Sequence, residues 1–113
     1  MEKQFAELYQ KIAQKIIAMI PVEWSEIYYL GWVTRDKMYS GSLFYYKDKE
    51  TQKFVYSNDI MTLYDVAKEE FMKDWQNLYQ AMRELYKCFI DNGQEAWEEV
   101  TIHILENGSF DVN

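Results

Sequence analysis

The chain is short, rich in aromatic residues and acidic. Its 113 residues are 49% hydrophobic and 18% aromatic, and its formal net charge is −7. A chain of this length hides roughly 65% of its extended surface on folding, which is enough for one hydrophobic core. The composition excludes a disordered chain, and we expect a single domain over residues 1–113.

The charge is unevenly distributed. Residues 1–56 carry eight basic and seven acidic side chains, whereas residues 57–113 carry four basic and twelve acidic ones. An acidic C-terminal half argues against direct binding of nucleic acid, which requires clustered Lys and Arg. It fits a basic protein partner, and equally an acidic surface that serves solubility alone.

Cysteine usage and hydropathy favour a cytoplasmic location. Cys88 is alone, so neither an internal disulfide nor a thiolate zinc cluster can form. The opening "MEKQFAELYQ" lacks the basic and apolar regions of a signal peptide. No window approaches 18 continuous apolar residues, so we expect no membrane span.

The first predicted element is an N-terminal helix. Apolar residues recur there at steps of three and four, which places them on one stripe. They are Phe5, Leu8, Tyr9, Ile12, Ile16 and Met19. Pro21, the only proline, predicts the end of this helix.

Three strands are predicted next, over Glu26–Val33, Ser42–Lys47 and Lys53–Ser57. Their aromatic and β-branched content and close spacing favour an antiparallel meander, with loops at Arg35–Gly41 and Asp48–Gln52. The first strand is apolar on both faces, which is typical of a central strand covered on both sides. The same pattern also fits a strand with an aromatic face free for a partner.

A connector over Ser57–Asp65 leads to the longest predicted helix. Its core stripe recurs at steps of four and three. The stripe is Ala67, Phe71, Trp75, Leu78, Met82, Leu85 and Phe89, widened by Met72, Tyr79 and Tyr86. Asn92-Gly93 predicts its end, with Gly93 as a left-handed cap.

The C-terminal segment is a predicted hairpin. Val100, Ile102 and Ile104 alternate with Thr101 and His103, and Asn107-Gly108 occupies the place of a tight turn. The order of elements is therefore α-β-β-β-α-β-β. It predicts an α+β fold in which a long second helix packs on an antiparallel sheet.

The residue types of known catalytic centres are sparse. His103, the only histidine, is expected on the solvent face of its strand, and Cys88 near a helix end is expected to pack in the core. The isolated glycines form neither a dinucleotide loop nor a phosphate loop, and the carboxylates form no calcium loop. We expect no catalytic residues, no metal and no cofactor, and a protein that is not an enzyme.

Aromatic residues offer a second class of function. Tyr28, Trp32, Tyr39 and Tyr46 belong to the predicted meander, and an exposed aromatic face is typical of a binding surface. The chain could use this face to bind a small ligand or a peptide, or to form a structural homodimer.

Three stretches of the sequence resemble one known family. They are "KIIAMIPVEWSEIYYLGWV", "GSLFYYKDKETQKFVYSNDI" and the "NGQEAWEEVTIHI" that follows the long helix. In this order they resemble the YezG-like antitoxin or immunity proteins over nearly the whole chain. Ala96 stands where the family usually has proline. Family members tend to continue after the last strand with aromatic and acidic residues, so we expect part of an acidic tail to be missing here.

The resemblance implies a non-enzymatic, cytoplasmic protein that neutralises a cognate toxin. Such proteins are similar to inhibitors of LXG-type polymorphic toxins, whose C-terminal domains are often nucleases. A nuclease is commonly basic where it grips phosphate, so an acidic surface could dock there and block substrate entry.

The segment after the long helix is the candidate contact for such a toxin. We name it the acidic shoulder and define it as Asp91, Glu95, Trp97, Glu98 and Glu99. Trp97 would be the natural anchor, because aromatic residues dominate interface energy. The alternative is that Trp97 only caps the core where the helix gives way to the strand.

Overall fold

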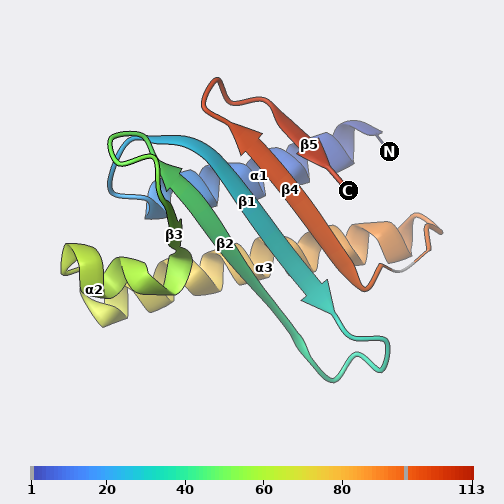
Figure 1. Ribbon diagram of the computed structural model, residues 1–113. Helices are drawn as coiled ribbons and strands as arrows, with labels where there is room; N and C mark the ends of the chain where they lie inside the picture. The colour runs from blue at the N-terminus through green and yellow to red at the C-terminus, as the bar shows by residue number, and fades with distance from the viewer. Residues whose placement is uncertain (1, 96) are drawn as a thin grey trace.

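An antiparallel sheet and two long helices form the two layers of the fold (Figure 1). The computed structural model describes residues 2–95 and 97–113; Ala96, the departure from the family pattern, lies outside them. Within that part of the chain the sheet has five strands, in the order β3-β2-β1-β4-β5. They are β1 (Trp24–Val33), β2 (Ser40–Asp48), β3 (Phe54–Tyr56), β4 (Glu99–Leu105) and β5 (Phe110–Val112).

Both long helices lie behind the same face of the sheet (Figure 1). They are α1 (Glu2–Met19) and α3 (Lys68–Asp91), and they run antiparallel. The Phe5 and Phe89 rings lie 4.6 Å apart at one end of the pair. Further along, Lys11 Nζ lies 3.0 Å from Glu84 Oε2. A single turn of 3₁₀ helix, η1 (Ser57–Asp59), and the short α2 (Ile60–Tyr64) join the sheet to α3.

The core lies between the helices and the covered face of the sheet. Alternation sorts the residues of each strand, so Ile27, Tyr29 and Val33 of β1 are buried against the helices. The other strands and both helices supply the remaining large buried side chains. These include Phe44, Tyr46, Ile102, Ile104, Ile12, Ile16, Leu78, Met82 and Leu85.

The α+β fold, the meander and the C-terminal hairpin are confirmed, and the differences lie at element ends. β2 begins at Ser40, so part of the expected Arg35–Gly41 loop is strand. Gly93 and Gly108 have φ of 72° and 90°, as a helix cap and a tight turn require. Met72 does not widen the core stripe of α3, because it is 42% exposed.

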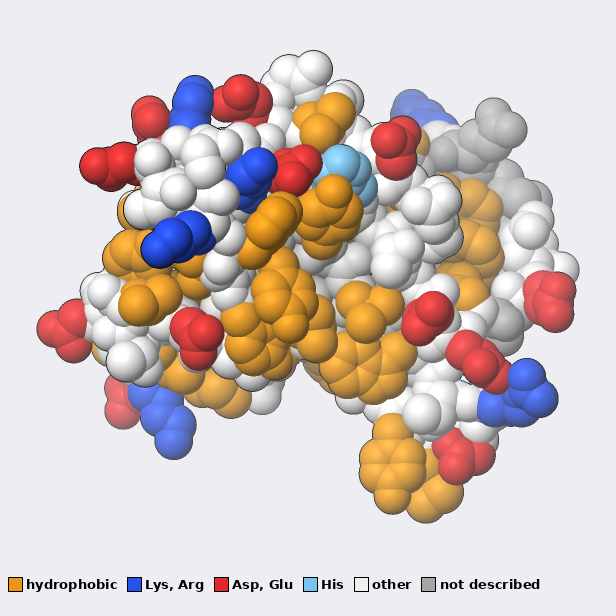
Figure 2. Space-filling model, in the orientation of Figure 1, with side chains coloured by type: hydrophobic (Ala, Val, Ile, Leu, Met, Phe, Trp, Pro, Cys, Tyr) orange, Lys and Arg blue, Asp and Glu red, His pale blue; other side chains and the backbone are white. Residues whose placement is uncertain are grey.

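The second face of the sheet is covered by neither long helix. We name it the open face; its apolar and aromatic side chains are Tyr28, Leu30, Trp32, Leu43, Tyr45, Phe54, Tyr56, His103 and Leu105. Figure 2 shows hydrophobic side chains gathered in the middle of this face beside the histidine. The sequence of β1 fitted either a strand covered on both faces or a strand with a free aromatic face. The structure has the second arrangement, because the long helices cover only the other face.

Tyr46 does not belong to that face, and its grouping with Tyr28 and Trp32 is corrected. Tyr46 pairs with Ile27 across β1 and β2, so both side chains point into the core. Its ring is 0% exposed, and its hydroxyl donates a hydrogen bond to Tyr64 Oη at 3.1 Å. Tyr39 is 66% exposed in the β1–β2 connection, one residue before β2 begins.

Within residues 2–95 and 97–113, neither α1 nor α3 nor any shorter helix is long and apolar enough to cross a bilayer.

Candidate protein-binding surface

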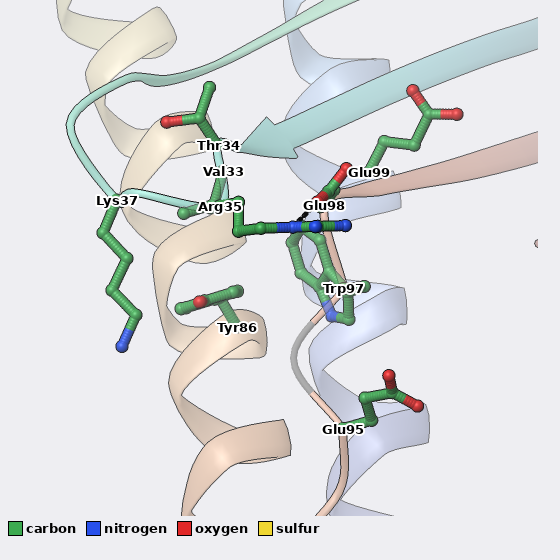
Figure 3. Close-up of a pocket in the computed structure, with 9 residues that line it drawn as sticks. All are labelled: Val33, Thr34, Arg35, Lys37, Tyr86, Glu95, Trp97, Glu98 and Glu99. Carbon is green, nitrogen blue, oxygen red and sulfur yellow. Dashed lines mark hydrogen bonds and ion pairs between the residues drawn. The ribbon is translucent and has the colours of Figure 1, made fainter.

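Most of the acidic shoulder surrounds one surface hollow of about 510 Å³ (Figure 3). The hollow lies where the end of β1, the start of β4 and the last turns of α3 meet. Its lining consists of Val33, Thr34, Arg35, Lys37, Tyr86, Glu95, Trp97, Glu98 and Glu99. Four of the five shoulder residues are thus brought together. Asp91 lines a neighbouring hollow with Lys37, Arg83 and Lys87.

Arg35 forms an ion pair with Glu98 of the acidic shoulder. Its Nε donates a hydrogen bond to Glu98 Oε1 at 2.7 Å, and the two side chains are 91% and 56% exposed. Exposed ion pairs contribute little to stability because water and salt screen them. The carboxylate of Glu98 can therefore exchange Arg35 for a cation on another protein at small cost.

A short hairpin carries Arg35 and Lys37 to the hollow. The Thr34 hydroxyl donates to Asp36 Oδ1 at 2.6 Å, and the Met38 N–H donates to the same oxygen at 3.0 Å. These two hydrogen bonds lower the pKa of Asp36, because they stabilise its charged form. Lys37 takes a left-handed φ of 63°, which reverses the chain.

Trp97 supports the hollow from the core side. Its indole meets Tyr86 and Phe89 edge-on, at centroid distances of 5.1 and 6.3 Å and interplanar angles of 87°. The ring is half-buried, and its Nε1 is buried without a hydrogen-bond partner in the described part of the chain. Trp97 therefore caps the core where α3 gives way to β4, and part of its ring also lines the hollow.

Sequence reasoning missed the cations of this site. Arg35 and Lys37 are 60 positions or more from Glu98 in the chain, and only the β1–β4 pairing brings them together. The closely spaced charges "RDK" in the loop were a possible signal for a charged site. The strand order is needed to show that Arg35 faces Glu98.

Aromatic pairs cover the open face. Tyr28 stacks on His103 with ring centroids 4.2 Å apart and planes within 5°, and it lies 5.9 Å from Phe54. Lys47 Nζ lies 5.8 Å from the centroid of the Phe54 ring, and His103 Nε2 lies 3.2 Å from Glu26 Oε2. Charged groups thus frame the aromatic rings at this end of the face.

The acidic shoulder and the open face meet at one cross-strand pair. Glu99 of β4 lies opposite Trp32 of β1, and cross-strand partners project to the same face. Glu99 is exposed, whereas the next residue, Val100, is buried on the core face. The two surfaces are therefore one continuous surface with aromatic, apolar and charged parts.

Histidine and cysteine occupy the places expected from their patterns. His103 lies on the open face, and Cys88 is buried near the end of α3. The Asn92 amide donates to the Cys88 carbonyl at 2.8 Å, which ties this turn of the helix to its cap. Among residues 2–95 and 97–113, no group of three or more His, Cys, Asp and Glu side chains could hold a metal ion.

These observations define a class of protein. Large contiguous apolar patches are uncommon on monomeric proteins, and such patches with polar rims mark interaction sites. The continuous surface formed by the open face and the acidic shoulder is of this kind. The chain is a small α+β domain with the surface of a protein-binding module.

Comparison with known proteins gives the family. The sequence matches the model of the family described as immunity protein YezG-like over residues 5–113, and the chain belongs to this family. It is 30% identical to immunity protein YezG of Bacillus subtilis strain 168 over 107 residues, which cover 95% of this chain and 70% of the relative. It is 26% identical to the type VII secretion system protein EsaG of Staphylococcus aureus over 113 residues, covering 99% and 68% of the two chains. The family identification from the three sequence stretches is thus confirmed. Membership of this immunity-protein family implies an antitoxin function.

Proposed function

We propose that this chain is a non-enzymatic, cytoplasmic immunity protein that binds a cognate bacterial toxin domain and neutralises it by covering it. The single observation that carries this proposal is the cross-strand pair of Glu99 and Trp32. It joins the acidic shoulder to the open face, so one partner can contact both. The family of immunity proteins supplies the kind of partner.

The charged and apolar parts of this surface have different roles in binding. The acidic shoulder accelerates encounter with a basic partner, because complementary charges steer association. The open face supplies aromatic area, which dominates interface energy once water is excluded. The nuclease domain of an LXG-type toxin fits the first requirement, because the groove in which a nuclease binds phosphate is commonly basic.

Cell survival tests the function directly. The toxin domain encoded beside this gene is expressed in a sensitive host, with and without this chain. We expect survival only in the presence of the chain. Equal killing in both cultures would exclude an immunity function against that toxin.

Two pairs of adjacent glutamates provide a matched test of the surface. Reversing the charge of Glu98 and Glu99 together should slow association with the purified toxin domain about 10-fold at low salt, and less at high salt. The control reverses Glu69 and Glu70, in the first turn of α3 at its other end, and so makes the same change in net charge. Equal slowing by both double variants would mean that net charge, and not the acidic shoulder, sets the rate.

A homodimer through the open face is the second candidate. The exposed rings of Tyr28, Tyr45 and Phe54 favour it, since an apolar patch of this kind also pairs with its own copy. Sedimentation velocity of the chain alone distinguishes the two states. A monomer at high concentration leaves the open face free for another protein.

A further inference from the structure

The outer edge of β2 is only half covered. β2 runs from Ser40 to Asp48, but β3 pairs with it only at Tyr45, Tyr46 and Lys47. The chain then turns away at Ser57 into η1. The first half of β2 therefore borders a groove in place of a neighbouring strand.

Backbone groups on this half of β2 point into the groove. The Phe44 N–H is directed away from β1, because it donates to Ser57 Oγ at 3.3 Å. In an antiparallel ladder the N–H and C=O of every second residue point to the same side. Ser42 and Ser40 thus direct their peptide groups toward the groove side. Ser42 is only 2% exposed, so its peptide groups are nearly buried, yet in the described part of the chain nothing is paired with them on that side.

The groove has a volume of about 560 Å³ and lies between the edge of β2 and α3. Its lining consists of Trp32, Ser40, Gly41, Ser42, Leu43, Tyr56, Asn58, Trp75, Gln76, Tyr79 and Gln80. None of these side chains is charged, although 27% of the residues in the chain are charged. An ionic ligand finds no counter-charge here, whereas the three carboxamides can each donate to and accept from a peptide group.

Ring stacking and a glycine shape the walls of the groove. A Cβ on Gly41 would lie 2.6 Å from Trp32 Cζ2, so glycine lets the indole lie across β2 at the mouth of the groove. On the other wall, the Tyr79 and Ser40 hydroxyls share a hydrogen bond that fixes the start of β2 to α3. The groove is therefore held open by packed side chains on both sides.

We propose that this groove takes an extended, uncharged segment of the partner toxin, which pairs with Ser40 and Ser42 of β2 as an added strand. The proposal rests on the proposed function for the identity of the partner. The occupant is a polypeptide because outward peptide groups recur every second residue, about 6.8 Å apart, which is the repeat of a β-strand. The segment is uncharged because the groove offers no ion pair.

Two measurements on the complex with the purified toxin domain test the pairing. In the first, amide hydrogen exchange of this chain is compared with and without the toxin domain. We expect the Ser42 amide to gain at least about 10-fold protection on binding, because it acquires an acceptor.

In the second measurement, Gln76→Glu places a charge on the groove wall and Asn77→Asp places the same charge next to it in the sequence. Asn77 lines a hollow on the α1 side of α3, away from β2. We expect Gln76→Glu to weaken binding about 10-fold or more, because a buried charge without a partner is costly, and Asn77→Asp to change it less than about 2-fold.

The outcomes separate this inference from the proposed function. If the complex forms while the Ser42 amide is unchanged, or if both variants bind alike, the added strand is overturned and the toxin is held elsewhere. If no complex forms with the toxin domain, the proposed function and the added strand fall together.

Discussion

The indole of Trp97 stands edge-on to the ring of Tyr86, with centroids 5.1 Å apart and planes at 87°. This contact joins the loop after α3 to the helix itself, at the place where the acidic shoulder begins. It makes Trp97 a structural residue first, although its outer edge is available to a partner.

Substitutions at Trp97 should separate packing from polarity. We expect Trp97→Ala to lower the free energy of unfolding by about 3 kcal/mol, because it leaves a cavity beside Tyr86 and Phe89. Trp97→Phe should cost less than about 1 kcal/mol, since it keeps a ring and removes an indole N–H that is buried without a partner. Urea denaturation measures both. Equal losses would contradict ring packing against Tyr86 and Phe89 as the source of the stability.

The proposed binding mode predicts that Arg35 competes with a basic partner for Glu98, so removal of Arg35 should favour binding. We expect Arg35→Ala to accelerate association with the toxin domain about 2- to 3-fold at low salt, because a positive charge is removed from the contact. Lys68→Ala, at the start of α3, makes the same change in net charge at the opposite end of that helix. A rate that rises equally in both variants would refute competition within the shoulder.

The open face should contribute to binding and little to folding. Phe54 is 50% exposed and Leu63, on α2, is 58% exposed. Replacing either by Ser should change stability by less than about 1 kcal/mol. Only Phe54→Ser should weaken the toxin complex, by about 10-fold, because it removes an aromatic ring from the patch. Isothermal titration of both variants decides; equal affinities would exclude the Phe54 end of the face as a contact.

Periodicity was enough to predict most of the fold. The helical stripes of α1 and α3 and the alternation in β4 each state which side is buried, and Gly93 and Gly108 marked reversals that only glycine makes cheaply. Tyr46 was misplaced because the run Phe44-Tyr45-Tyr46 is apolar at every position. Alternation then carries no information, and the register with Ile27 decides the face.

The candidate site was predictable only in part. The acidic shoulder is contiguous in sequence, so its residues could be named together. The cations beside it and the groove along β2 depend on which strands are neighbours and how far each pairing extends. A three-residue β3 leaves half of β2 unpaired, and no local sequence pattern predicts where this pairing ends.

Buried tyrosines should make the fold sensitive to alkali. Burial raises the pKa of Tyr46 above its ordinary value, and the hydrogen bond with Tyr64 raises it further; burial likewise raises the pKa of Tyr29. A raised pKa means that the folded state keeps its proton after the unfolded state has lost it. The stability that these groups contribute is therefore complete below about pH 10 and is lost as pH rises above it.

The size of that loss is measurable with one variant and one control. Each tyrosine of this kind should lower the free energy of unfolding by about 1.4 kcal/mol per pH unit above pH 10. Tyr46→Phe should lower the free energy of unfolding by about 1 kcal/mol at neutral pH, because a hydrogen bond is lost. Above pH 10 it should make the fall of that free energy with pH less steep, by about 1.4 kcal/mol per pH unit. Phe54→Leu, at a position 50% exposed, removes no ionisable group and should leave the slope unchanged. Urea denaturation at a series of pH values tests this, and a Tyr46→Phe slope equal to that of the unsubstituted chain would contradict it.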